Sequence, residues 1–172
     1  MSSYEHQEIL LPVNPVFIVF TFIVAALLNM LPVSGGWALW LRPDFVALLV
    51  LYWCIEQPQR VGFGSAFFLG LLMDVADGAL FGQHALAYSI LAYAGIALHR
   101  RVRMFKLAPQ VMHVIPLLLL NDLIVLAIRT LAGANFPGYR YFAGSLVAAA
   151  LWPVVSILLK MPQRTRSDPD HV

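Results

Sequence analysis

Residues 107–128, LAPQVMHVIPLLLLNDLIVLAI, form an apolar run in which Asp122 is the one charged side chain. A largely apolar stretch of about 18 or more residues is long enough to cross the hydrocarbon core of a membrane as a helix. The run therefore predicts a transmembrane helix. Pro116 lies inside it and is expected to kink it, because proline cannot donate the backbone hydrogen bond that a helix interior requires.

Five further apolar stretches have the same character. They cover residues 13–31, 37–55, 61–81, 83–98 and 141–159, and short segments that contain proline or glycine separate most of them. None shows the alternation of a membrane β-strand, and only a helix satisfies its backbone hydrogen bonds within a single span. The sequence thus predicts an all-α integral membrane protein of about six transmembrane helices, with sequential helices antiparallel.

The composition agrees with this class. The 172 residues are 60% hydrophobic and 12% charged, which is more apolar surface than a water-soluble fold of this size can bury. We expect one six-helix membrane domain, residues 13–160, between a cytoplasmic N-terminal segment, residues 1–12, and a disordered cytoplasmic tail, residues 161–172. The net charge of +2 comes from basic residues in short loops, a pattern of membrane topology rather than of nucleic-acid binding.

The basic residues also predict the orientation, because Lys and Arg accumulate on the cytoplasmic side of a membrane. With the N-terminus inside, the cytoplasmic segments hold eight of them: Arg60, Arg100, Arg101, Arg103, Lys106, Lys160, Arg164 and Arg166. The opposite side receives Arg42, Arg129 and Arg140. We therefore predict that both ends of the chain are cytoplasmic.

Charged residues within the spans are the candidates for function, because such groups are costly in lipid and usually face other helices or water. In this topology six of them lie at one depth, in the outer leaflet: Arg42, Asp44, Asp74, Asp77, Asp122 and Arg129. Their common level predicts a polar cluster that opens outward. Two interpretations remain open: a contact site for a partner or a small polar ligand, or internal pairing of aspartates with arginines that fixes the bundle.

Small residues recur every four positions along the third predicted helix. Gly62, Ala66, Gly70 and Gly78 form this stripe, with Asp74 in the same register. Small side chains on one helical face allow another helix to approach closely. We expect the stripe to be a helix-packing groove that could receive a partner's transmembrane helix.

No pattern of an enzyme is present in the sequence. The five histidines (His6, His84, His99, His113 and His171) lack metal-ligand spacing, and the chain has no nucleophile elbow and no phosphate-binding glycine loop. We expect no catalytic, cofactor-binding or metal-ligating residue.

Several short segments together resemble the family of the rod shape-determining protein MreD. They are LRPDF at 41–45, LYW at 51–53, PQRVG at 58–62, GLLMD at 70–74 and GQHALAY at 82–88. The resemblance implies a non-enzymatic subunit of the cell-elongation complex in the bacterial inner membrane, required for rod shape and for organising peptidoglycan synthesis. It implies as partners an MreC-like single-span protein, an MreB-like filament, and a peptidoglycan glycosyltransferase and transpeptidase.

The resemblance has two further implications. The family is similar in architecture to the substrate-binding subunits of energy-coupling-factor transporters, whose ligand pocket opens outward, so a small-solute transporter subunit is the alternative function. Asp74, in the matching GLLMD stretch, is expected to matter for assembly.

Membrane lipid is a further expected partner, since the basic run at residues 99–106 could contact anionic headgroups. The same run also serves as a topology signal.

Overall fold

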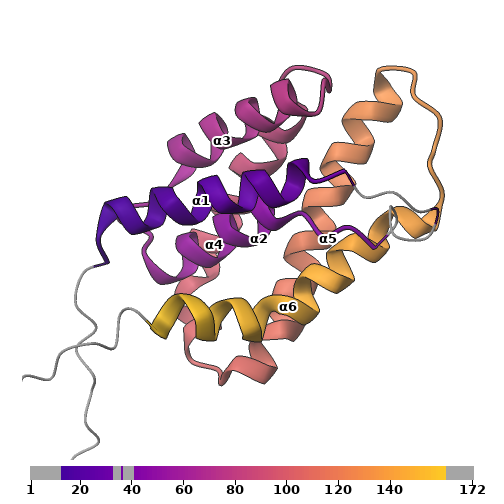
Figure 1. Ribbon diagram of the computed structural model, residues 1–172. Coiled ribbons are helices and arrows are strands. Elements are labelled where there is room, and N and C mark those ends of the chain that lie inside the picture. Colours follow the sequence, from indigo (N-terminus) through magenta and orange to yellow (C-terminus); the bar gives the residue numbers. More distant parts are fainter. Residues whose placement is uncertain (1–12, 33–35, 37–40, 162–172) are drawn as a thin grey trace, which may run out of the picture.

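The computed structural model describes residues 13–32, 36 and 41–161, and all regular structure within them is helical (Figure 1). The elements are α1 (Pro15–Met30), α2 (Phe45–Glu56), α3 (Phe63–Ala76), α4 (Gln83–Arg103), α5 (Leu107–Leu131), the short 3₁₀ helix η1 (Tyr139–Phe142) and α6 (Ala143–Lys160). The prediction of six α-helices is confirmed. The predicted N-terminal segment, and the predicted tail beyond Met161, lie outside the described residues.

Two helices are shorter than the apolar runs that predicted them. α2 begins at Phe45, because Pro43 disfavours helical backbone at Arg42 and the Asp44 side chain caps the helix, accepting a hydrogen bond from the Ala47 backbone N–H at 3.0 Å. α3 ends at Ala76 instead of near residue 81, because the chain turns at Gly78, whose φ of 58° is in the left-handed region that favours glycine. Residues 37–40, the predicted start of the second helix, lie outside the described residues.

Two segments are long and apolar enough to cross a membrane: α5 and the combined η1–α6 segment, Tyr139–Lys160. α1, α2 and α3 are apolar but shorter. The 12 residues of α2 measure about 18 Å along the helix axis, less than the roughly 30 Å of a hydrocarbon core. A span built on α2 or α3 would therefore have to include the loops and capping residues next to these helices.

α2 lies at the centre of the fold. Every residue from 46 to 55 is buried, because α1, α4, α5 and α6 all pack against this helix. α4 also packs against α3 and α5, and α5 packs against α6. A helix that is apolar on all sides and buried on all sides is a core helix, and the other helices are arranged around it.

The two ends of the bundle differ in charge. α1 begins and α6 ends at one end, on the left of Figure 1. There the Glu56 carboxylate forms ion pairs with Lys160 Nζ at 2.9 Å and with Arg103 Nε at 3.7 Å. These ion pairs connect α2, α4 and α6. The aspartates singled out in the sequence lie toward the opposite end.

Candidate functional site

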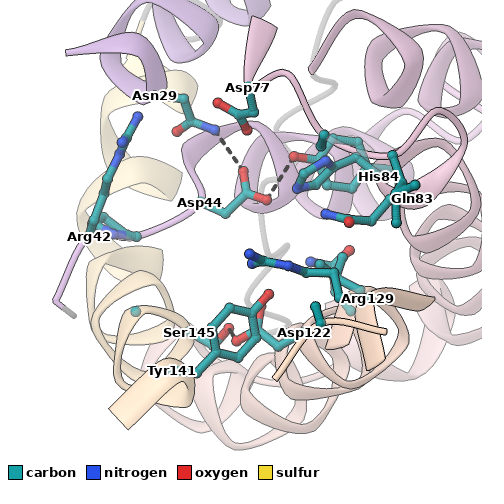
Figure 2. Close-up of a pocket in the computed structure, with 18 of the residues that line it drawn as sticks. Asn29, Arg42, Asp44, Asp77, Gln83, His84, Asp122, Arg129, Tyr141 and Ser145 are labelled. Carbon is teal, nitrogen blue, oxygen red and sulfur yellow. Dashed lines mark hydrogen bonds between the residues drawn. The ribbon is translucent and has the colours of Figure 1, made fainter. Parts of the chain in front are cut away.

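A cavity of about 550 Å³ lies at the end of the bundle opposite Glu56 (Figure 2). It is formed where α1 ends, α2 begins, α3 turns into α4 and α6 begins, with the second half of α5 as a further wall. Its polar lining residues are Asn29, Arg42, Asp44, Asp77, Gln83, His84, Tyr88, Asn121, Asp122, Arg129, Tyr141 and Ser145. Five of the six charged residues that the sequence singled out thus line one cavity, and Asp74 is the exception.

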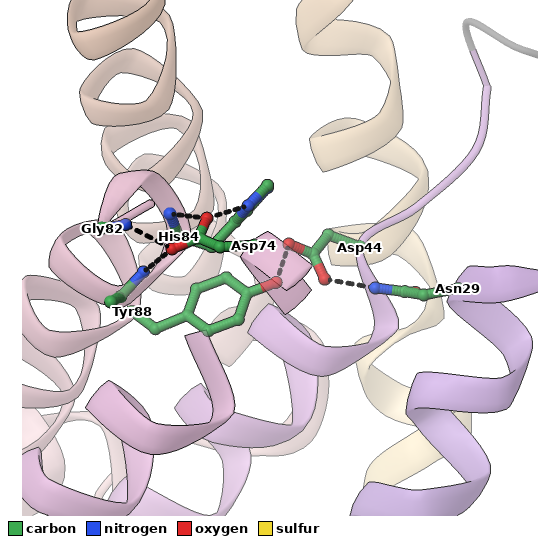
Figure 3. Close-up of polar contacts among 7 residues, drawn as sticks. Asn29, Asp44, Asp74, Gly82, His84 and Tyr88 are labelled. Carbon is green, nitrogen blue, oxygen red and sulfur yellow. Dashed lines mark hydrogen bonds and ion pairs between the residues drawn. The ribbon is translucent and has the colours of Figure 1, made fainter. Parts of the chain in front are cut away.

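Asp44 connects three helices at the floor of this cavity. One carboxylate oxygen accepts hydrogen bonds from the Asn29 side-chain amide at 2.9 Å and from the backbone N–H of Ala47. The other accepts the Tyr88 hydroxyl at 2.7 Å (Figure 3). The Asn29 carbonyl in turn accepts the backbone N–H of Phe45 at 2.9 Å. Asp44 therefore caps α2 and also holds the end of α1 and the first turns of α4 against it.

Asp74 has a different role from the other aspartates. Its carboxylate is buried and accepts backbone N–H groups of Gly82 and His84, both at 2.8 Å (Figure 3). It also lies 2.9 Å from His84 Nδ1. The first backbone N–H groups of a helix have no partner within the helix, and Asp74 satisfies these groups at the start of α4. Asp74 thus fixes the α3–α4 turn and does not itself line the cavity, although its partner His84 does.

Neutral donors, rather than arginines, bond to two aspartates of the cavity, Asp44 and Asp122. Asp122 accepts a hydrogen bond from the Ser145 hydroxyl, which joins α5 to α6. Among the described residues, no ion pair joins Arg42 or Arg129 to an aspartate. Internal Asp–Arg pairing, one of the two interpretations of the sequence, is therefore not how these residues are arranged. In Figure 2 the Arg129 side chain points toward the middle of the cavity, between Asp44 and Tyr141.

The small-residue stripe is divided between packing and turns. Ala66 and Gly70 are buried against α4, and a Cβ atom at Gly70 would collide with the backbone of His84 and Ala85. Gly62 caps α3, and Gly78 forms the turn after it. The helix that the stripe receives is thus the chain's own α4, and this face of α3 is not open to a partner's transmembrane helix.

Several residues of the site were not predicted from the sequence. Asn29, Gln83, Tyr88, Asn121 and Ser145 line the cavity, and none of them belongs to the predicted polar cluster. They are uncharged, so the common depth of charged groups does not point to them. A feature of the sequence could have indicated three of the lining residues. Close to the start of the fourth apolar stretch, and therefore at the depth of Asp77, lie Gln83, His84 and Tyr88. Within the described part of the chain, no group of three or more His, Cys, Asp or Glu side chains is placed to hold a metal ion.

Comparison with known proteins assigns the family. The family model described as rod shape-determining protein MreD matches residues 12–162. The chain belongs to the MreD family. It is 27% identical over 143 residues to the rod shape-determining protein MreD of Haemophilus influenzae, an alignment that covers 83% of this chain and 88% of that protein. No solved structure matches the chain. The match to the MreD family spans all six helices and every residue of the cavity, and so extends the resemblance noted for segments between residues 41 and 88.

Proposed function

We propose that this MreD-family chain is a non-enzymatic subunit of the cell-elongation complex in the bacterial inner membrane. In this role it binds an MreC-like single-span protein, and through it connects an MreB-like filament to a peptidoglycan glycosyltransferase and transpeptidase. The observation that carries the proposal is the family match over residues 12–162, since it includes the whole bundle. All six helices cross the membrane in this account, with both ends of the chain cytoplasmic and the cavity on the outer face.

The outward face of α3 is the contact surface that we propose for the single-span partner. Phe67, Phe68, Leu72 and Val75 are 40%, 68%, 65% and 63% exposed on this helix. The opposite face of α3 is occupied by α4, so a partner has to use the exposed side. Van der Waals packing contributes to helix association in lipid, and the exposed apolar side chains of α3 are available for such packing.

A steric block on this face tests the proposal. Leu72→Trp is expected to reduce co-purification of the MreC-like partner at least several-fold, because a larger ring prevents close packing between helices. The melting temperature of the isolated subunit in detergent should not change, since the side chain lies outside the bundle. Cells that rely on the variant should lose rod shape and become round.

Leu123→Trp is the matched control, because Leu123 is 55% exposed on α5, away from the proposed contact. It should leave partner recovery and cell shape unchanged. Full recovery of the partner with Leu72→Trp, at normal expression, would rule out α3 as the contact surface.

The alternative function, a small-solute transporter subunit with architecture similar to that of energy-coupling-factor proteins, draws on the same cavity. Transport through the bundle would need a path from the cavity toward the Glu56 end. Tyr52, Trp53 and Trp152, each at most 1% exposed, fill the core between them. Because these side chains are packed, the cavity is expected to be closed toward the Glu56 end. A closed cavity supports the proposal that the subunit does not transport a solute.

A further inference from the structure

The cavity wall contains a buried acceptor without a partner in the protein. Asn121 is 2% exposed, and within the described part of the chain its side-chain carbonyl oxygen has no hydrogen-bond partner. Buried polar atoms are almost always paired, so each unpaired one calls for a specific explanation. Asn121 lines the cavity, so this unpaired oxygen belongs to a residue of the cavity wall.

The charges around the cavity indicate what such a molecule would carry. Asp44 and Asp122 already accept hydrogen bonds from protein donors. Arg42 and Arg129 line the same cavity without an ion pair to an aspartate among the described residues. A guanidinium group matches carboxylate and phosphate oxygens with paired N–H donors. The groups left for recognition of a ligand are therefore two cations, the exposed carboxylate of Asp77 and one buried acceptor.

We propose that the cavity is a binding site for a small anionic molecule. Its carboxylate or phosphate group is held by Arg129 and Arg42, and one of its N–H or O–H groups donates to the Asn121 carbonyl oxygen. The volume of about 550 Å³ lies within the usual range for small-molecule sites. Gln83, which is 4% exposed and also lines the cavity, is a further polar group for such a ligand. A scaffold that only binds other subunits does not need this site, so the inference goes beyond the proposed function.

Replacing Asn121 separates a ligand-binding role from a structural one, even before a ligand is known. Asn121→Leu keeps the size of the side chain and removes the unpaired carbonyl. The variant also loses the hydrogen bond from the Asn121 amide to Asp122, so the melting temperature of the purified subunit should fall less than it does when two hydrogen bonds are lost. Cells that rely on it should lose rod shape, because the site is damaged.

Asn29→Leu is the control for this experiment. Asn29 is also buried in the cavity wall, but its amide bonds both Asp44 and Phe45, so this variant should melt at a lower temperature. A melting temperature for Asn121→Leu as low as that of Asn29→Leu, or normal rod shape in cells that carry it, would overturn the proposal.

Direct binding tests the anionic group. N-acetylmuramic acid and N-acetylglucosamine offer similar hydroxyl and amide donors, and only the first carries a carboxylate. In titration calorimetry, the purified subunit should bind N-acetylmuramic acid, glutamate or inorganic phosphate with a dissociation constant in the millimolar range or below. It should bind N-acetylglucosamine at least tenfold more weakly. A response to phosphate alone would identify the anion as a phosphate, and a response to the acids alone would identify it as a carboxylate.

Arg129→Gln provides the second variant, since Arg129 is exposed and its replacement should leave the fold intact. It should weaken binding of the responding anion at least tenfold without changing the melting temperature. Equal affinity of this variant and the natural protein, or no response to any of the three anions, would overturn the proposal.

Discussion

Asp74 and Asp77 are one helical turn apart in the sequence, yet they have different roles. Asp74 is 1% exposed, and its carboxylate accepts two short backbone N–H bonds at the start of α4. Burying a carboxylate is costly unless hydrogen bonds replace its hydration, and here the backbone of the next helix supplies them. Asp77 is exposed at the rim of the cavity. A difference of three positions thus separates a residue that holds the fold from one that faces solvent or ligand.

Asp74→Asn should destabilise the subunit. The amide has one acceptor oxygen in place of two, so at least one of the N–H groups of Gly82 and His84 is left unpaired, and the charge that favours the start of α4 is lost. The free energy of unfolding should fall by about 1–3 kcal/mol, the usual cost of an unsatisfied buried group. Denaturation of the purified subunit in detergent measures it.

Asp77→Asn is the matched control and should change the free energy of unfolding by less than about 0.5 kcal/mol, as expected for an exposed side chain. Equal losses for the two variants would contradict the separate roles of the two aspartates.

The sequence predicted the charged part of the site better than its neutral part. Arg42, Asp44 and Asp122 could be placed at one depth because charge within an apolar span is rare and its position is informative. Which groups bond to them could not be predicted, because Asn29 and Ser145 are 15 and 23 residues distant along the chain from their aspartates. Such contacts depend on how the helices pack, and helix periodicity alone does not determine packing.

At the scale of elements, α3 and α4 pack closely against each other at Gly70. Gly70 is the reason, since the backbone of Ala85 occupies the space that a side chain at this position would need. The every-four-residue spacing of small residues predicted a close approach, and the structure supplies the identity of the helix that approaches. The sequence did not indicate it, because a small-residue stripe is equally suited to a helix of the same chain and to one of a partner.

Gly70→Ala should therefore weaken the α3–α4 contact. Its new methyl group meets backbone atoms, which cannot rotate away, so one helix has to shift. Overpacking of this kind costs about 1–3 kcal/mol. Thermal unfolding of the purified subunit should show a lower melting temperature than for the natural protein.

Gly64→Ala is the control on the same helix. A Cβ atom there has no neighbour within 4 Å, and alanine is the better helix former by up to about 1 kcal/mol. This variant should melt at the same temperature or slightly higher. If both variants shifted the melting temperature by the same amount and sign, close packing at Gly70 would not be the cause.

The helix boundaries show where hydropathy is a poor guide. Hydropathy predicted a second helix that starts too early and a third that ends too late. The apolar sequence extends beyond Asp44, which caps the start of α2, and up to and past Gly78, which forms the turn after α3. Hydropathy ended the fourth helix too early, because α4 continues to Arg103 through a basic run that hydropathy scores as a loop. Capping and turn residues, rather than polarity, determine these ends.

At the scale of the whole molecule, an even number of antiparallel helices brings the beginning of α1 and the end of α6 to one end of the bundle. The basic residues Arg60, Arg103 and Lys160 lie at that end, and the polar cavity lies at the other. In a membrane, the excess of basic residues would place the first end in the cytoplasm and the cavity on the outer face. The proposed ligand site and the proposed partner contact both depend on this orientation.

Labelling of single cysteines tests the orientation most directly. Cys54 is buried, and Cys54→Ala provides a background without a thiol. Into this background Ala134→Cys places a thiol at the cavity, and Gln59→Cys places one in the segment between α2 and α3, at the opposite end; both positions are exposed. We predict that a membrane-impermeant maleimide labels the Ala134→Cys variant in intact spheroplasts and labels the Gln59→Cys variant only after permeabilisation. The reverse pattern would place the cavity in the cytoplasm and contradict the account.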